Sequence, residues 1–544
     1  MNGTPQLLVV AALAVPFAML FACVLPGMCQ RILSLLWIAP MPALAAGLFG
    51  GAQPLLWDWP PGRVTLMLDR AGAILLGVAA LLWIASGVYA PRYLRSAPHG
   101  TRFAVCWLLT LIGNIGVFVT ADLASFYLAF ALASIPAYGL LLHDTTPKTE
   151  RAGAIYMVLT LLGENFLLLG FILLAAATPN GSLNIRDCIA ALPTSPWRDP
   201  TLALLIAGFG LKAGLVPLHV WMPLTYTAAP IPAASVLSGA VVKAGVIGFV
   251  RFIPFGHGLP GWGGALAAAG LLSAFYGVAV GITQANPKTV LAYSSISQMG
   301  LIAMVVGTGL ANGDHGTALV VAFYAAHHIL AKGALFLVIG VVATTGSARP
   351  WPVHFPAAVL GLGLAGLPLT GGALAKLAVK GTLGDGVAAM LATLSAAGSA
   401  LLMLHFLHRL RAIGVRDSKT AEPIALVLPW LTMALAAVVV PWMLYFADGM
   451  GSLSDALSPK ALWAALWPIL IGGLLAIGLR RWAKFLPAVP EGDIVVAGER
   501  AARTTVALGA ALESTDIVLR RWPVACLSLL GVAIILAALM LTGR

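Results

Sequence analysis

The sequence predicts an all-α polytopic membrane protein with about 16 transmembrane helices. Of its 544 residues, 60% are hydrophobic and only 9% are charged, whereas soluble domains carry about 25% charged residues. Apolar runs of about 20 residues, long enough for a helix to cross a bilayer, recur along most of the chain. The basic residues are spread over the short segments between these runs, so the net charge of +12 indicates membrane topology, not a nucleic-acid partner.

The apolar runs define the predicted spans in order. The first run, from about residue 4 to 26, lacks a basic leader and a small-residue cleavage site, so we expect a retained span and not a signal peptide. The sixteen spans are predicted to begin near residues 4, 30, 70, 103, 122, 152, 201, 232, 262, 290, 316, 353, 385, 422, 461 and 522.

The loops between these spans predict the orientation in the membrane. One face receives 19 Lys and Arg residues, among them Lys148 and Lys288, and the other receives eight, among them Arg70 and Arg251. Because cytoplasmic loops hold the excess of Lys and Arg, the first face, called the basic face below, is predicted to be cytoplasmic. Both termini would then lie on the non-cytoplasmic side of the inner (plasma) membrane.

Four lysines fall inside predicted spans, namely Lys212, Lys243, Lys332 and Lys376, and Glu164 is the acidic residue that lies well within one. A charge at mid-membrane costs roughly 2.5–3.5 kcal/mol, so four lysines together cost on the order of 10 kcal/mol. In a helix bundle with a purely structural role, nothing would offset this free-energy cost. Ionisable groups at this depth therefore indicate an ion pathway.

Two spans are predicted to be discontinuous. The runs "GLKAGLVPL" (210–218) and "GLGLAGLPL" (361–369) are both interrupted by a proline, which removes a backbone donor and clashes with the preceding turn. Unwound backbone at membrane depth survives only when it is buried in protein or lines a wet cavity. Paired broken helices are typical of two inverted-repeat halves around an ion path.

These features divide the chain into six parts. The N-terminal spans one to three occupy residues 1–100, the first repeat half 101–255, the second repeat half 256–415, the peripheral spans 416–479, a cytoplasmic amphipathic segment 480–521 and the C-terminal span 522–544. The amphipathic segment interleaves charged and apolar residues, so a short helix is predicted there. It would lie on the membrane surface or clamp a neighbouring subunit.

Four segments resemble the antiporter-like subunits of respiratory complex I, of membrane-bound hydrogenases and formate hydrogenlyase-type complexes, and of Mrp cation/proton antiporters. They are "LKAGLVPLHVWMPLTYTAAPIPAASVLSGAVVKAGVIGFVRF" (211–252), "ANPKTVLAYSSISQMGLIAM" (285–304), "HHILAKGALFLVIG" (327–340) and "GLPLTGGALAKL" (366–377). Together the resemblance covers roughly residues 100 to 400 in the expected order, and it implies a proton path through buried ionisable residues.

The resemblance implies a role for each member of this path. Lys212 matches the lysine of the first broken helix, and Lys243 matches the connecting lysine on the next span. His328 and Lys332, one helical turn apart on one face, match the central relay of the second half. Lys376 matches the terminal position. A poorly solvated lysine changes its protonation state readily, which suits it to a relay.

One position departs from the family pattern. The family places a glutamate on the fifth span as the partner of the first lysine, and this chain has Ala131 there, within "FYLAFALASIPAY" (126–138). The nearest carboxylate belongs to Glu164 in "LLGENFLLLG" on the sixth span. We hypothesise that Glu164 replaces the missing partner of Lys212. The alternative is a non-conducting scaffold subunit.

Three further residues are possible accessories to the path. His219 is either a hydrogen-bonding residue at a helix end or a proton carrier, and His327 is expected to face lipid or a neighbour. Lys380 is an alternative exit group. Asp122, at a span boundary, is expected to cap a helix.

Nothing in the sequence predicts a cofactor or a metal. The five cysteines are scattered without a CxxC pair, and neither a phosphate-binding loop nor a dinucleotide motif is present. No redox or hydrolytic site is predicted, so we expect a proton-translocating subunit of an oxidoreductase-type complex, driven by other membrane subunits and a soluble partner. Two alternatives remain: a sodium/proton antiporter subunit, and the membrane subunit of a two-component inorganic-carbon uptake system that hydrates carbon dioxide.

Overall fold

The protein is built almost entirely of helices. The computed structural model describes residues 4–51, 53–59, 62–95, 100–345, 350–413, 424–482, 487, 489–496 and short stretches up to 534. The amphipathic segment predicted at 480–521 and the span predicted at 522–544 lie mostly outside the described residues. The chain divides into two units, Met1–Glu491 and Gly492–Arg544, and the first unit contains every element considered below.

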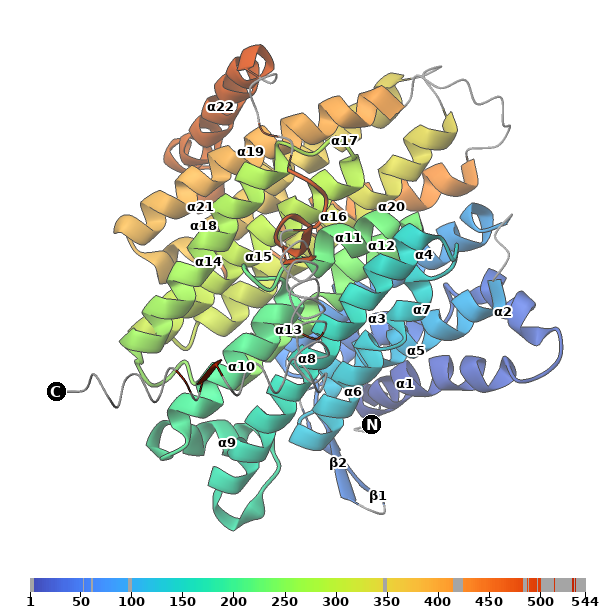
Figure 1. Cartoon of the computed structure of the whole chain (residues 1–544), viewed down its shortest axis with the longest axis vertical. Helices are drawn as coiled ribbons and strands as arrows, with labels where there is room; N and C mark the ends of the chain where they lie inside the picture. The colour runs from blue at the N-terminus through green and yellow to red at the C-terminus, as the bar shows by residue number, and fades with distance from the viewer. Residues whose placement is uncertain are drawn as a thin grey trace. The chain divides into compact units, whose positions relative to one another are not determined.

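Twelve helices among the described residues are long and apolar enough to cross a membrane, which confirms the all-α polytopic fold. They are α1 (Thr4–Ala22), α4 (Arg70–Tyr93), α5 (Gly100–Val119), α6 with α7 (Leu123–Ser134 and Ala137–Leu141), α8 (Pro147–Ala177), α12 with α13 (Ile231–Val236 and Lys243–Phe252), α14 (Pro260–Gly281), α15 (Pro287–Asn312), α16 (Thr317–Thr345), α19 (Val387–Ile413), α20 (Ile424–Ala447) and α22 (Pro459–Trp482). Many of these helices run side by side (Figure 1).

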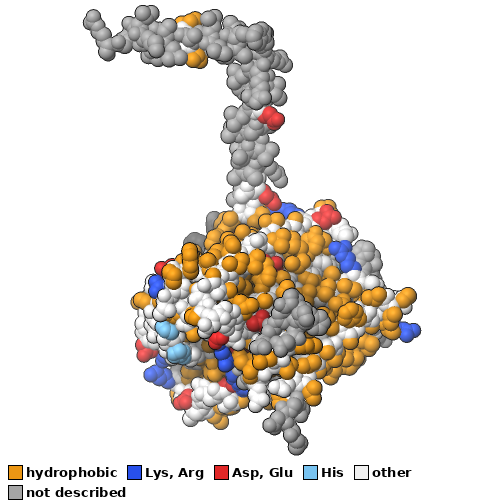
Figure 2. Space-filling model, turned by 90° about the horizontal axis from the view of Figure 1, so that it is seen from below, with side chains coloured by type: hydrophobic (Ala, Val, Ile, Leu, Met, Phe, Trp, Pro, Cys, Tyr) orange, Lys and Arg blue, Asp and Glu red, His pale blue; other side chains and the backbone are white. Residues whose placement is uncertain are grey.

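Shorter helices supply most of the remaining predicted spans. They are α2 (Met28–Leu35), α3 (Met41–Phe49), α9 (Ile185–Ala191), α10 (Arg198–Ala213), α11 (Trp221–Ala228), α17 (Pro350–Ala365), α18 (Gly371–Leu383) and α21 (Leu453–Ala456). Helices α2 and α3 occupy the predicted second span. The total of sixteen spans stays a prediction. Hydrophobic side chains cover much of the described face in Figure 2, as a surface in contact with lipid requires.

A small hairpin between α3 and α4 is an element that the sequence did not predict. Strands β1 (Leu55–Trp59) and β2 (Gly62–Leu66) pair antiparallel, with Leu55 opposite Leu66. The hairpin is fixed to the bundle through Asp122, whose Oδ2 accepts from Thr65 N at 2.8 Å. The same carboxylate caps α6 through Ser125 N at 2.8 Å, which confirms the predicted capping role.

Both predicted helix breaks are present. Between α10 and α11 the chain unwinds from Gly214, and between α17 and α18 it unwinds from Gly366, with φ angles of 77° and 100° that favour glycine. Each break therefore divides one predicted span into two shorter helices.

The two broken helices run in opposite directions. Helix α10 begins beside the first turn of α14, where Trp262 Nε1 donates to Asp199 Oδ1 at 3.0 Å. Helix α18 ends beside the end of α15, where Thr382 Oγ1 donates to Asp314 Oδ2 at 3.0 Å. Helices α14 and α15 are consecutive and pack antiparallel, so the first turn of α14 lies beside the end of α15. Both sites therefore lie at one face of the bundle. Opposite directions are what two inverted repeats require.

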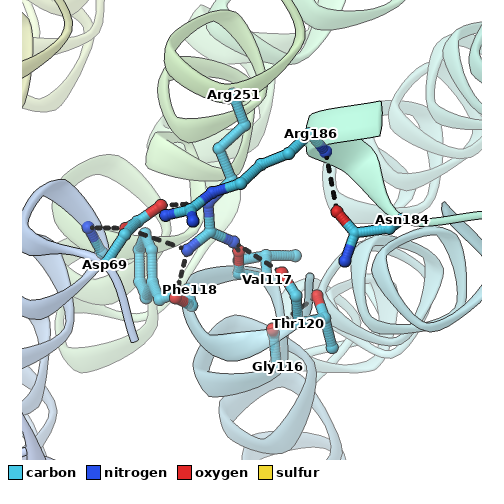
Figure 3. Close-up of polar contacts among 9 residues, drawn as sticks. Asp69, Gly116, Val117, Phe118, Thr120, Asn184, Arg186 and Arg251 are labelled. Atoms are coloured by element: carbon cyan, nitrogen blue, oxygen red, sulfur yellow. Dashed lines mark hydrogen bonds and ion pairs between the residues drawn. The ribbon is translucent and has the colours of Figure 1, made fainter. Parts of the chain in front are cut away.

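At this same face, Arg251 at the end of α13 ties three segments together (Figure 3). Its guanidinium donates to both carboxylate oxygens of Asp69 at 3.2 Å, and to the main-chain carbonyls of Val117, Phe118 and Thr120 at 2.9, 2.6 and 2.9 Å. We call this group the Arg251 clamp. Burial on its own raises the pKa of Asp69, but the adjacent Arg251 guanidinium outweighs burial and leaves the pKa below its ordinary value.

Candidate functional site

Lys212 lies in the last turn of α10, directly before the first break, and its side chain is buried. Its Nζ donates to Ser134 Oγ at 2.6 Å and stands 5.5 Å from the centre of the Phe130 ring. A cavity of about 10 Å³ adjoins these groups. That volume holds about one water molecule, so the ammonium group has a polar partner on one side and room for solvent on the other.

The unwound backbone at the first break is held by two buried side chains. Val216 N donates to Ser273 Oγ at 2.9 Å, and Trp221 Nε1 donates to Leu211 O at 2.9 Å. These bonds replace the intrahelical bonds that the break removes. They explain how irregular backbone persists at membrane depth, and they fix the end of α10 that carries Lys212.

Ser134 is a partner of Lys212 that sequence reasoning missed. It lies three residues after Ala131 on α6, the helix on which the resemblance places a glutamate. Its hydroxyl accepts from Lys212 and donates to Phe130 O at 2.8 Å, while Tyr156 OH donates to its carbonyl at 2.7 Å. Serine is common in helices, so its position in the sequence carried no signal.

Glu164 lies on α8 and is 4% exposed. Among the described residues its Oε1 has no hydrogen-bond partner, and none of the ion pairs joins it to Lys212. The charge of Lys212 nevertheless acts on this carboxylate. The structure thus brings the two groups into one neighbourhood without direct contact, and the role of Glu164 as a replacement partner stays a prediction.

Replacing Glu164 with glutamine is expected to lower proton flux about tenfold, a change of roughly 1.4 kcal/mol. Glutamine keeps the shape of the side chain but removes the negative charge that acts on Lys212. Flux is measured in liposomes containing the purified complex. The control is Glu150→Gln in the exposed first turn of the same helix. Wild-type flux from a correctly assembled Glu164→Gln complex would refute the role.

Lys243 and His328 form a direct contact between α13 and α16. Lys243 Nζ lies 2.9 Å from His328 Nδ1, and both side chains are fully buried. The charges that act on this pair come from other cationic side chains and not from a carboxylate. The contact therefore joins two proton-binding groups.

Lys332 lies one helical turn after His328 on α16, as predicted, and is fully buried. Its Nζ donates to Leu291 O on α15 at 2.7 Å. Ser295 Oγ donates to the same carbonyl at 3.2 Å and lies 3.1 Å from Ser238 Oγ. A small polar group thus surrounds the ammonium nitrogen of Lys332 on the basic-face side of the path.

Of the two alternatives expected for His327, lipid or a neighbour, the structure agrees with the second. Its side chain is 4% exposed, and neither ring nitrogen has a hydrogen-bond partner among the described residues. The ring lies against the start of α18: a Cβ built on Gly371 would stand 2.7 Å from Nδ1, and one built on Gly372 would stand 3.1 Å from Nε2. Helix α16 is enclosed by protein on all sides, so two adjacent histidines can both be buried.

Lys376 lies on α18, just past the second break, and its Nζ donates to Ala365 O at the end of α17. It lines a cavity of about 380 Å³ with largely apolar walls. Lys380, which is 55% exposed, also lines this cavity and pairs with Asp385 at 3.6 Å. Lys376 is thus the half-buried group and Lys380 the exposed group of one cavity, on the face opposite the basic face.

His219 lies within the first break and is fully buried. Its ring centre stands 5.0 Å from that of Tyr276 on α14 and 6.4 Å from that of Tyr293 on α15. The side chain therefore packs on helices of the second half. Its accessory role stays a prediction.

The path residues form separate contacts and not one continuous chain. Helices α10 and α13 touch closely, since a Cβ built on Gly245 would stand 2.9 Å from Ala213 N and 3.3 Å from the carbonyl carbon of Lys212. Yet no hydrogen bond between described side chains joins Lys212 to Lys243. A proton path through these residues would need water wherever the side chains do not meet. Across residues 4–482, so far as they are described, no three His, Cys, Asp or Glu side chains gather to hold a metal ion.

Comparisons with known proteins agree with this geometry. Residues 120–405, more than half of the chain, match the family described as NADH:quinone oxidoreductase/Mrp antiporter, TM. An uncharacterized protein of Mycobacterium tuberculosis is 34% identical over 353 residues, which are 60% of this chain; the chain spans about half, 54%, of that relative's length.

Two further similarities concern named ion-transport proteins. A probable K(+)/H(+) antiporter subunit of Rhizobium meliloti is 31% identical over 430 residues, covering 70% of this chain and 77% of that protein. Among solved structures, the Mrp complex from Dietzia sp. DQ12-45-1b aligns with a TM-score of 0.77 and 20% identity, covering 99% of this chain and 63% of the other. The chain belongs to the NADH:quinone oxidoreductase/Mrp antiporter transmembrane family.

Proposed function

We propose that this chain translocates protons as a subunit of a multi-subunit, energy-converting membrane complex. The proposed path, called the lysine row below, comprises Glu164, Lys212, Lys243, His328, Lys332 and Lys376. One observation carries the proposal: Lys243 Nζ lies 2.9 Å from His328 Nδ1 in fully buried surroundings.

This contact makes the two groups share a proton. Two cations at such a distance repel strongly, because the protein interior screens charge far less than water does. One of the two groups must therefore be neutral and accept the hydrogen bond: either an ammonium proton of Lys243 points at an imidazole lone pair of His328, or the Nδ1–H of His328 points at a neutral Lys243 amine. A change of charge at Lys212 or Lys332 then favours one location of the proton over the other. Such a pair can pass a proton from the first half to the second.

The same chemistry disfavours an alkali cation in the lysine row. The Rhizobium meliloti relative is named a probable K(+)/H(+) antiporter subunit, so cation antiport is the second candidate function. Sodium and potassium ions need oxygen ligands, and lysine ammonium groups repel them. Glu164 is the sole carboxylate of the row. A cation route would therefore lie outside the row, within this chain or in a partner subunit.

Partners and orientation follow from the same proposal. The lysine row holds no site of oxidation or hydrolysis, so its driving energy would come from other membrane subunits and a soluble partner. The excess of Lys and Arg at the basic face supports a cytoplasmic location for that face and a non-cytoplasmic location for both termini. Co-purification with a tag on this chain would identify the partners.

The proposed function is tested by proton flux through the purified complex in liposomes, driven by an imposed membrane potential. Wild-type complex is expected to pass protons, and Lys212→Ala is expected to pass them about tenfold more slowly, a loss of roughly 1.4 kcal/mol, because water in the adjoining cavity keeps part of the route. The control is Lys460→Ala, at an exposed position at the start of α22. Absence of flux in the wild type would leave the scaffold alternative.

A further inference from the structure

Val489 and Glu491, described residues that follow α22, are attached at the basic face by several polar contacts. Gln284 Nε2 donates to Val489 O at 3.1 Å. Glu491 forms an ion pair with Lys148 at the start of α8, at 2.8 Å, and accepts from Thr289 Oγ1 on α15 at 3.0 Å. The Glu491 side chain is 27% exposed, so its carboxylate meets both solvent and a buried hydroxyl group.

A series of hydroxyl groups leads inward from this carboxylate. Thr289 is fully buried, and its Oγ1 lies 2.8 Å from Thr227 Oγ1 near the end of α11. Two residues further along α15, roughly 3 Å of helical rise, the carbonyl of Leu291 accepts from Lys332 Nζ at 2.7 Å. The contact of α15 with Glu491 and its contact with Lys332 thus lie within one helical turn of each other.

Several charged side chains surround Glu491 at the basic face. Lys148 pairs with it directly, and Lys288 lies close enough for the two charges to interact. Lys288 Nζ is itself held by the carbonyls of Thr227 and Ala229 at 3.0 and 2.6 Å. Asp144 also acts on this cluster. Two lysines and two carboxylates thus gather at the surface, beside the buried hydroxyl group of Thr289.

We propose that Glu491 is the group through which protons reach the lysine row from the basic face, with Thr289 and Thr227 as the first hydrogen-bonded steps toward Lys332. This inference rests on the proposed function. The carboxylate binds a proton from solution, a proton moves along the hydroxyl groups and bridging water, and the neutral amine of Lys332 receives one, so that the carboxylate is ionised again. At each hydroxyl group and water molecule one O–H bond forms as another breaks, so that these groups are unchanged after the transfer.

Glu491→Gln tests the proposal. Glutamine can still accept from Thr289 but cannot take up a proton, so flux should fall about tenfold, less than for a proton-transfer group inside the row, because water can still deliver protons at this surface. The deficit should grow as the pH on the basic face rises, because protons become scarce, and it should shrink as that pH falls. Glu150→Gln, exposed on the same face, is the matched control.

Exchanging the charges of Lys148 and Glu491 distinguishes a role of Glu491 in proton uptake from a role in attaching its segment to α8. In Lys148→Glu combined with Glu491→Lys, the ion pair can form again, but no carboxylate faces Thr289. Proton uptake at Glu491 predicts that flux stays low in this double variant and also falls in Thr289→Val. Recovery of wild-type flux in the exchange, or wild-type flux in Glu491→Gln at high pH, would overturn the proposal. Absence of flux in the wild type would instead overturn the proposed function.

Discussion

Lys243→Ala is expected to lower proton flux about a hundredfold, the low end of what one positioned proton-transfer group contributes. The reason is the direct contact of Lys243 with His328, which lies between the two halves of the lysine row in fully buried surroundings. Lys212, by contrast, adjoins a small cavity that can hold water. Flux would be measured in liposomes with the complex reconstituted at equal protein content.

Lys243→Arg distinguishes loss of a proton carrier from loss of a charge. Arginine keeps the positive charge but holds its proton too firmly to release it, so flux should stay as low as in Lys243→Ala. His328→Gln keeps a hydrogen-bond acceptor for Lys243 and should also conduct poorly. Size-exclusion profiles identical to the wild type would show that each variant complex assembles. Normal flux in Lys243→Arg would contradict the relay.

Arg251→Ala is expected to destabilise the protein by about 3–5 kcal/mol, because it leaves a largely buried carboxylate without its partner. The substitution removes the donors of the Arg251 clamp, so Asp69 and three main-chain carbonyls lose their hydrogen bonds. Thermal unfolding in detergent measures the effect. Arg198→Ala is the matched control: Arg198 pairs with Asp199 at 2.9 Å, but both side chains are exposed, so its loss should leave the stability close to that of the wild type.

The pH dependence of unfolding separates the clamp from a general packing defect. The pKa of Asp69 is lower in the folded protein than its ordinary value, which is about 3.9 in an unfolded chain. The stability that the clamp adds is therefore fully present above about pH 4 and is lost as the pH falls through the lower folded value. Arg251→Ala should lose this part of the pH dependence. An unchanged acid profile in Arg251→Ala would contradict the assignment.

The fold and the candidate path residues could be predicted from the sequence because they follow from local chemistry. Apolar runs set the helices, and the helix breaks at Gly214 and Gly366 follow from the glycine and proline content of two runs. A lysine in an apolar run is unusual enough to be noticed on its own. For this reason all four intramembrane lysines were identified before their surroundings were known.

The partners of these residues could not be predicted, because helix packing brings them together from distant parts of the chain. Ser134 and Lys212 are 78 residues apart, Lys243 and His328 are 85 apart, and Thr289 and Glu491 are 202 apart. From the sequence, a carboxylate was the expected partner of Lys212. In the structure, helix packing places Ser134 beside Lys212 and His328 beside Lys243. The hairpin of β1 and β2 was missed for a related reason, since its attachment depends on Asp122 beyond α5.

A map of the purified complex at a resolution that shows ordered water tests the central claim most directly. Our account predicts water molecules beside Lys212 and in the intervals that separate it from Lys243 and Lys332 from Lys376, so that each buried amine has a solvent-mediated link to the next. Dry apolar packing in those intervals, with the amines hydrogen-bonded to protein alone, would contradict it.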